Sequence, residues 1–299
     1  MLRSAIHAAA DSPRIRRFVD RYGMRLGAAR FVAGETLDEA VVTLRRLNGQ
    51  GLRTNTTMLG EGVADADATR RVAEAYEDVL RRIDAEQLQT NVALKPTHLG
   101  VLIDEELAYA NLERVVAEAG RLGNFIRIDM EDSPLVDVTL RTYRRLREAG
   151  HDNVGTVLQS YLFRSEADLE ALLPLSPNLR IVKGAYREPA DVAYPRKADV
   201  DAAYRRLVER SVADGGFTAV ATHDEKLIEH ALGLGAASDR IELQMLYGVR
   251  SQLQLDLVRR GHRVLVATPF GPDWYPYLMR RLAERPANLV FFAKSVLRG

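Results

Sequence analysis

The sequence of 299 residues predicts a distorted (β/α)8 barrel preceded by N-terminal helices. From about residue 50 onward, short apolar runs alternate eight times with helix-like segments, which is typical of parallel strands joined by right-handed crossovers. Eight such units need about 250 residues, and that length is available. An open doubly wound sheet is the alternative. It normally carries G-x-G-x-x-G at its first strand–helix turn, where this chain reads TTMLGEGVAD.

Residues 1–48 are expected to form an N-terminal helical segment, and residues 49–299 the barrel. One helix is predicted to begin at Ser12-Pro13. A second is predicted after Thr36, because Thr36 and Glu39 have the spacing of a capping box. The eight predicted strands cover residues 52–59, 91–95, 125–130, 154–160, 179–185, 217–223, 240–246 and 263–269.

The segments between the strands carry local helix signals. Pro134 suits the first position of a helix that begins at Asp132-Ser133-Pro134. Ser165 and Asp168 have capping-box spacing, and Gly233 is interpreted as the C-cap of a helix. The first helix between strands is expected to bury a stripe with steps of three and four: Val72, Tyr76, Val79, Leu80 and Ile83.

Composition limits the classes of function. Lys and Arg number 42 against 41 Asp and Glu, so the net charge of +1 argues against a nucleic-acid partner. The chain has no cysteine, which excludes disulfides, thiolate metal sites and a cysteine nucleophile. Its six histidines lack metal-ligand spacing, so no metal is expected. With no long apolar run and no signal peptide, we expect a cytoplasmic protein that can still contact a membrane peripherally.

Polar side chains follow seven of the eight predicted strands, where a barrel gathers its functional groups. Each one alone is explained as a loop charge or a helix cap, but the coincidence across seven strands predicts a site. Arg280 and Arg281 follow the eighth strand and can bind one carboxylate together. The strand-end residues are Glu61, Lys95, Asp129, Glu131, Gln159, Lys183, Arg187, His223, Asp224 and Gln244.

These residues leave three classes of function open. Lys95 and Lys183 suggest a cofactor-free Schiff-base lyase, although ion pairing with nearby acids is the simpler explanation. Asp129 and Glu131 suggest a glycosidase pair, but they lie on one turn, whereas glycosidase acids normally face each other across a cleft. A barrel that binds a small molecule without catalysis is the third class.

Seven segments, in order, resemble the proline dehydrogenases in their short, monofunctional bacterial form. RIVKGAY and the pattern YLxRRLxE are the most specific of them. The segments are ALKPTHLG (93–100), RIDMEDSP (127–134), VLQSYLFR (157–164), RIVKGAYREP (180–189), ATHD (221–224), MLYGVR (245–250) and WYPYLMRRLAERP (274–286).

The resemblance implies a barrel that binds FAD non-covalently. It implies oxidation of L-proline to Δ1-pyrroline-5-carboxylate by hydride transfer from C5 to flavin N5, with electrons passed to membrane quinone. This is the first step of proline degradation to glutamate, so a separate pyrroline-5-carboxylate dehydrogenase would complete the conversion.

The resemblance also implies roles for individual residues. Asp129 and Arg180 would form the catalytic centre near flavin N5, and Glu61 would pair with an arginine of the carboxylate clamp, Arg280 and Arg281. The implied substrate-binding residues are Lys95, Leu246, Tyr277, Arg280 and Arg281. The implied cofactor-binding residues are Met130, Gln159, Arg180, Lys183, Gly184, Ala185, Thr222 and His223.

Two positions depart from the family pattern. Ala267 stands where the family usually has a tyrosine over the substrate, and Thr57 stands where it often has an aspartate. We therefore expect a looser, more exposed substrate site, with Phe270 as a candidate replacement for the missing ring.

Overall fold

The computed structural model describes residues 28–284, and within them eight parallel strands close into a barrel in chain order. This confirms the predicted (β/α)8 architecture and excludes the open sheet. The helix predicted at Ser12-Pro13 lies outside the described residues, and the division at residue 48 stays a prediction. The strands are β1 (Arg53–Met58), β2 (Thr90–Leu94), β3 (Ile126–Ile128), β4 (Val154–Gln159), β5 (Asn178–Val182), β6 (Phe217–Ala221), β7 (Ile241–Leu246) and β8 (Val264–Phe270).

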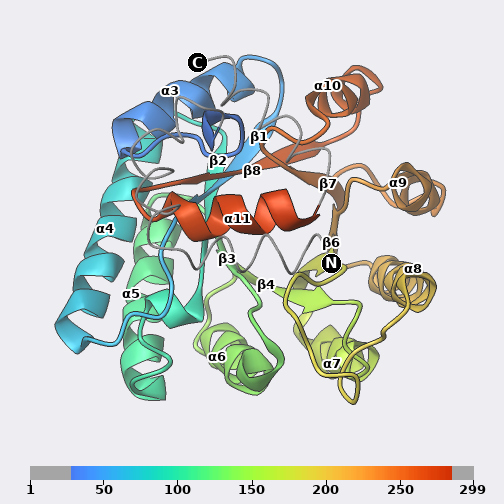
Figure 1. Ribbon diagram of the computed structural model, residues 1–299, viewed down its shortest axis with the longest axis horizontal. Helices are drawn as coiled ribbons and strands as arrows, with labels where there is room; N and C mark the ends of the chain where they lie inside the picture. The colour runs from blue at the N-terminus through green and yellow to red at the C-terminus, as the bar shows by residue number, and fades with distance from the viewer. Residues whose placement is uncertain (1–27, 285–299) are drawn as a thin grey trace.

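Helices surround the barrel, and α11 lies across one end of it instead of beside β8 (Figure 1). The outer face of β1 and β8 is covered by α3, which precedes the barrel in the sequence. The helices are α3 (Leu37–Asn48), α4 (Ala66–Ala85), α5 (Glu105–Arg121), α6 (Val136–Glu148), α7 (Ser165–Leu172), α8 (Lys197–Ala213), α9 (Glu225–Leu232), α10 (Ser251–Arg259) and α11 (Trp274–Glu284). Short 3-10 turns are η1 (Ala28–Arg30), η2 (Pro96–His98), η3 (Ser133–Leu135) and η4 (Leu173–Leu175).

Several local sequence signals work as predicted. Thr36 is the N-cap of α3, and its hydroxyl accepts a hydrogen bond from the backbone N–H of Glu39. Gly233 is the C-cap of α9. The predicted stripe of α4 faces the core, with Val72 partly buried and Tyr76, Val79, Leu80 and Ile83 buried.

Two predicted helix starts are wrong in detail. Ser165 does not cap α7, because its hydroxyl donates to the carbonyl oxygen of Gln159 at 2.6 Å and Arg164 holds the N-cap position. Asp168 pairs instead with Arg164, at 2.8 Å. Pro134 lies in the 3-10 turn η3, and α6 begins only at Val136.

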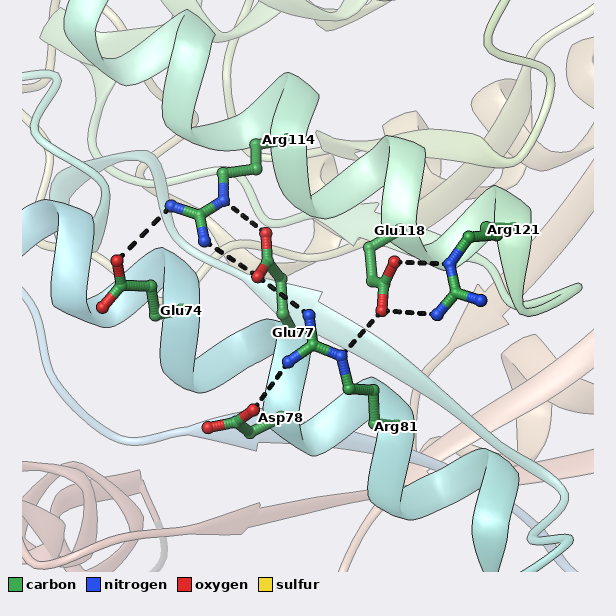
Figure 2. Close-up of polar contacts among 7 residues, drawn as sticks. All are labelled: Glu74, Glu77, Asp78, Arg81, Arg114, Glu118 and Arg121. Carbon is green, nitrogen blue, oxygen red and sulfur yellow. Dashed lines mark hydrogen bonds and ion pairs between the residues drawn. The ribbon is translucent and has the colours of Figure 1, made fainter.

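Ion pairs join neighbouring helices around the outside of the barrel. Figure 2 shows the part between α4 and α5, where Glu77 accepts from Arg81 and Arg114, and Arg81 also pairs with Glu118. Glu77 is only 7% exposed, although both arginines reach solvent.

Ion pairs between neighbouring helices recur around the outer ring of the barrel, and we call this set of ion pairs the ion-pair belt. Within the described residues, α10 and α3 are neighbouring ring helices without an ion pair between them. A cavity of about 270 Å³ lies there, lined by Arg46 of α3, Tyr247, and Ser251 of α10. The other ion pairs of the belt are Arg82–Asp38 (α4–α3), Arg145–Glu106 (α6–α5), Arg164–Asp137 (α7–α6), Arg206–Glu166 (α8–α7) and Arg260–Glu229 (α10–α9). Between α9 and α8, His230 Nε2 lies 2.9 Å from Glu209 Oε1.

The barrel has an apolar shell and a polar interior. Alternate residues of each strand face outward, and side chains such as Val92, Leu94 and Leu243 pack in the buried apolar core. The intervening residues face inward. None of the described helices has the length and apolar character needed to cross a membrane.

Candidate active site

A cavity of about 450 Å³ lies at the carboxyl ends of the strands. Every strand, or the loop that follows it, contributes to its lining, and α11 contributes Tyr277, Arg280 and Arg281. All fourteen site residues predicted from the sequence line this one cavity: Lys95, Asp129, Met130, Gln159, Arg180, Lys183, Gly184, Ala185, Thr222, His223, Leu246, Tyr277, Arg280 and Arg281.

Arg180 on β5 lies at the centre of a hydrogen-bond network inside the barrel. Its Nη1 donates to Asp129 Oδ1 at 2.7 Å, which places the two predicted catalytic residues in direct contact. Its Nε donates to Gln244 Oε1 at 2.6 Å, and its Nη2 to Asn55 Oδ1 at 3.2 Å. The guanidinium plane is therefore fixed by acceptors from three other strands or strand ends.

Sequence reasoning missed Asn55, and it placed Gln244 at a strand end without giving it a role. The alternation of Arg53, Asn55 and Thr57 in β1 is the pattern that identifies Asn55 as inward-facing. Asn55 donates through Nδ2 to Asn91 of β2, so its carbonyl oxygen is left to face Arg180.

Glu61 bridges two cations at the mouth of the cavity. One carboxylate oxygen accepts from Arg280 Nη1 at 2.7 Å, and the other contacts Lys95 Nζ. The predicted pairing of Glu61 with one of the two adjacent arginines, Arg280, is therefore confirmed, despite the threonine at position 57. Burial raises the pKa of Glu61, but the charges and hydrogen bonds of Lys95 and Arg280 outweigh burial and hold it at about 2.

The loop that carries Glu61 rests on a buried histidine. Gly60 has φ +156°, and a Cβ there would meet the imidazole of His98, 2.5 Å from Nε2. His98 is buried and packs edge-on against Tyr76, with ring centroids 6.0 Å apart. Burial lowers the pKa of His98 to about 4, so its ring is neutral at physiological pH.

On the other side of the cavity, Lys183 is held by two carboxylates. Its Nζ lies 2.6 Å from Asp201 and 3.2 Å from Asp224. With the Lys95–Glu61 contact, both lysines of the cavity are therefore ion-paired, as the simpler explanation for them predicted. Asp224 itself does not line the cavity.

The backbone also shapes the side of the cavity on which Lys183 lies. Gly184 has φ +114°, and a Cβ at this position would overlap the ring of Tyr161. His223 Nε2 accepts from the backbone N–H of Leu246 at 2.9 Å, which orients its ring.

Besides Glu61, which lies at the mouth, three strand-end residues do not line the cavity. Glu131 is buried and accepts from Thr97 through the backbone N–H (3.0 Å) and the hydroxyl (2.7 Å). Asp129 and Glu131 thus have separate partners, which argues against a glycosidase pair. Arg187 and Asp224 also lie outside the lining.

Phe270 was the predicted replacement for the missing ring, and this prediction is wrong. Phe270 packs in the apolar core and does not line the cavity, because its position in β8 is out of phase with the inward-facing Ala267 and Pro269. The aromatic rings that line the cavity belong to Tyr186 and Tyr277.

The lining carries five cations and one carboxylate, that of Asp129. The cations come from β2, β5 and α11 or their adjoining loops: Lys95, Arg180, Lys183, Arg280 and Arg281. Carboxylates just outside the lining, those of Glu61, Asp201 and Asp224, pair with three of these cations. A concave site with charged groups at the carboxyl ends of a (β/α)8 barrel has the position and composition of an enzyme active site.

Comparison with known proteins shows to which family of enzymes the chain belongs. Residues 40–294 match the family model described as proline dehydrogenase. The chain is 42% identical over 310 residues to the proline dehydrogenase of Deinococcus radiodurans, covering 100% of this chain and 99% of that protein. It is 41% identical over 279 residues to proline dehydrogenase 2 of Bacillus subtilis, covering 92% of each.

A solved structure agrees in fold. Proline utilization A from Bdellovibrio bacteriovorus, inactivated by N-propargylglycine, superposes with a TM-score of 0.79 at 20% identity, over 93% of this chain and 38% of that longer chain. The chain belongs to the proline dehydrogenase family. It is an oxidoreductase of proline catabolism.

Proposed function

We propose that this protein oxidises L-proline to Δ1-pyrroline-5-carboxylate with FAD as its cofactor, by hydride transfer from proline C5 to flavin N5. The observation that carries the proposal is the single cavity that gathers Arg180, the clamp and the Gly184 segment at one end of the barrel. We also propose that the electrons pass to a membrane quinone, which requires peripheral contact between a cytoplasmic protein and the membrane.

The residues of the cavity fit FAD chemically. Apolar strand ends such as Val157 and Val182 offer a flat ring system a dry surface, and the cations balance a pyrophosphate. Gly184 has no Cβ, and one at this position would overlap the ring of Tyr161, so the backbone of this segment lines the cavity directly. The residues proposed to hold FAD are Met130, Gln159, Arg180, Lys183, Gly184, Ala185, Thr222 and His223.

When bound, FAD supplies the acceptor for the hydride, and the protein supplies position and charge. Arg280 and Arg281 bind the proline carboxylate, with Lys95 beside them, while Leu246 and Tyr277 enclose the ring. Fixing the carboxylate in this way turns a mobile substrate into a correctly oriented one. The surrounding cations also disfavour the protonated amine, whose lone pair must be free.

Arg180 serves a different purpose. It lies deep in the cavity, held by Asp129, where its charge stabilises negative charge that develops only during the reaction. Its replacement by methionine should therefore lower turnover while the cofactor stays bound.

The visible spectrum before and after anaerobic addition of proline tests the proposal. We expect a yellow protein that bleaches with proline and whose colour returns with a short-chain quinone. A preparation that is colourless after loading with FAD, or that shows no proline-dependent dye reduction, would refute it. Borohydride trapping of a carbonyl substrate on Lys95 or Lys183 would favour the lyase instead. The product would then need a separate pyrroline-5-carboxylate dehydrogenase to reach glutamate.

A further inference from the structure

We propose that Gln244, held in place by Glu242, is a positioning residue that orients the guanidinium of Arg180 without neutralising it. This inference rests on the proposed function, because it concerns the group that faces the reacting centre.

The first argument is the choice of acceptors around Arg180. One is a carboxylate, that of Asp129 at 2.7 Å, and the other two are neutral amide oxygens, those of Gln244 at 2.6 Å and Asn55 at 3.2 Å. Each of the three nitrogens thus has an acceptor, but only one of the three acceptors carries a negative charge. An amide fixes geometry as a carboxylate does and leaves the positive charge to act on the contents of the cavity.

The second argument is that the amide of Gln244 has only one orientation available. Its Nε2 donates to Glu242 Oε1 at 2.8 Å, so the carbonyl oxygen must point to Arg180. Gln244 is 5% exposed and Glu242 2% exposed, so both side chains are largely shielded from bulk solvent. The chain Glu242–Gln244–Arg180 therefore runs through the barrel interior.

The third argument is that Glu242 is itself anchored. Nitrogens of Arg53 and Arg263 each lie 3.6 Å from its Oε2, at the opposite end of the barrel from the cavity. The orientation of Arg180 thus depends on groups that never meet the substrate. A residue such as Gln244 acts through Arg180 and should influence rate more than substrate binding.

The test compares Gln244→Met with Gln252→Met in the FAD-loaded protein. Gln252 is an exposed glutamine of α10 whose amide donates to Asp256 Oδ1 at 3.1 Å, and it does not line the cavity. For Gln244→Met we expect kcat about tenfold lower, equivalent to 1.4 kcal/mol. We also expect KM for proline within threefold of wild type, the cofactor-to-protein ratio unchanged, and a more negative midpoint potential of the bound flavin. Gln252→Met should leave kcat and the potential as in wild type.

Gln244→Asn is the second variant, in case Gln244→Met does not fold. It keeps the amide but shortens the side chain by one methylene, so it should lower kcat and the potential in the same direction. If either folded variant keeps both kcat and potential, or loses cofactor while turnover per bound cofactor is unchanged, the positioning role is wrong. A wild-type protein without bound flavin or proline oxidation would refute the proposed function instead, which separates the two failures.

Discussion

Replacing Arg280 by methionine removes one guanidinium of the clamp and keeps the unbranched stem of the side chain. Truncating one partner of a buried charged pair costs about 2–5 kcal/mol. Because the Arg280 side chain is 32% exposed, solvent screening places the loss at the lower end of that range. We therefore expect kcat/KM for proline to fall roughly 30-fold, which corresponds to a free-energy loss of about 2 kcal/mol.

Loss of Arg280 also leaves Glu61 paired only with Lys95, and its carboxylate then repels the substrate carboxylate. Arg280→Lys restores the charge but not the two-pronged geometry, so it should recover part of the loss. Steady-state kinetics with proline provide the assay, with Arg259→Met on exposed α10 as a matched control. Near-normal kcat/KM in Arg280→Met would remove this residue from the substrate site.

The remaining predictions test the cofactor side, a buried histidine and the ion-pair belt. Gly184→Ala pushes a Cβ into the ring of Tyr161, so the purified protein should contain much less flavin, measured by absorbance; full flavin content would contradict this. The pKa of His98 is about 4 when folded and 6.5 when unfolded, so the unfolded state binds the proton first. The free energy of unfolding should thus fall by up to about 3 kcal/mol between pH 7 and pH 4, and His98→Asn should flatten this slope in denaturant titrations. Glu77→Gln should lower the free energy of unfolding by about 1 kcal/mol at low salt and by less at 1 M salt. The control variant Asp78→Asn, at an exposed residue, should leave the free energy of unfolding nearly unchanged. Equal losses in both variants at all salt concentrations would rule out an electrostatic cause.

The sequence predicted the barrel because strands and helices differ in the period of their hydrophobic residues. Eight alternations of strand and helix then leave few architectures other than a closed barrel. It also predicted that residues such as Lys95 and His223 share a cavity, since strand ends of a barrel must meet. Asn55 was missed because it lies inside a strand and not at a strand end. A buried polar side chain within a strand can be recognised only once the inward face of that strand is known. Ser165 was misassigned because capping-box spacing cannot show that the β4 carbonyl of Gln159 lies closer.

The missing contact of the ion-pair belt between α10 and α3 has a consequence for how the molecule opens. Among the described helices, this is the seam where the first ring helix meets the last, and it holds a void instead of a charged bridge. Amide protons along α3 and α10 should exchange with solvent sooner than those of α4 and α5. Leu246 lines the large cavity and the next residue, Tyr247, lines this seam. We therefore expect opening of the seam to alter the wall of the large cavity.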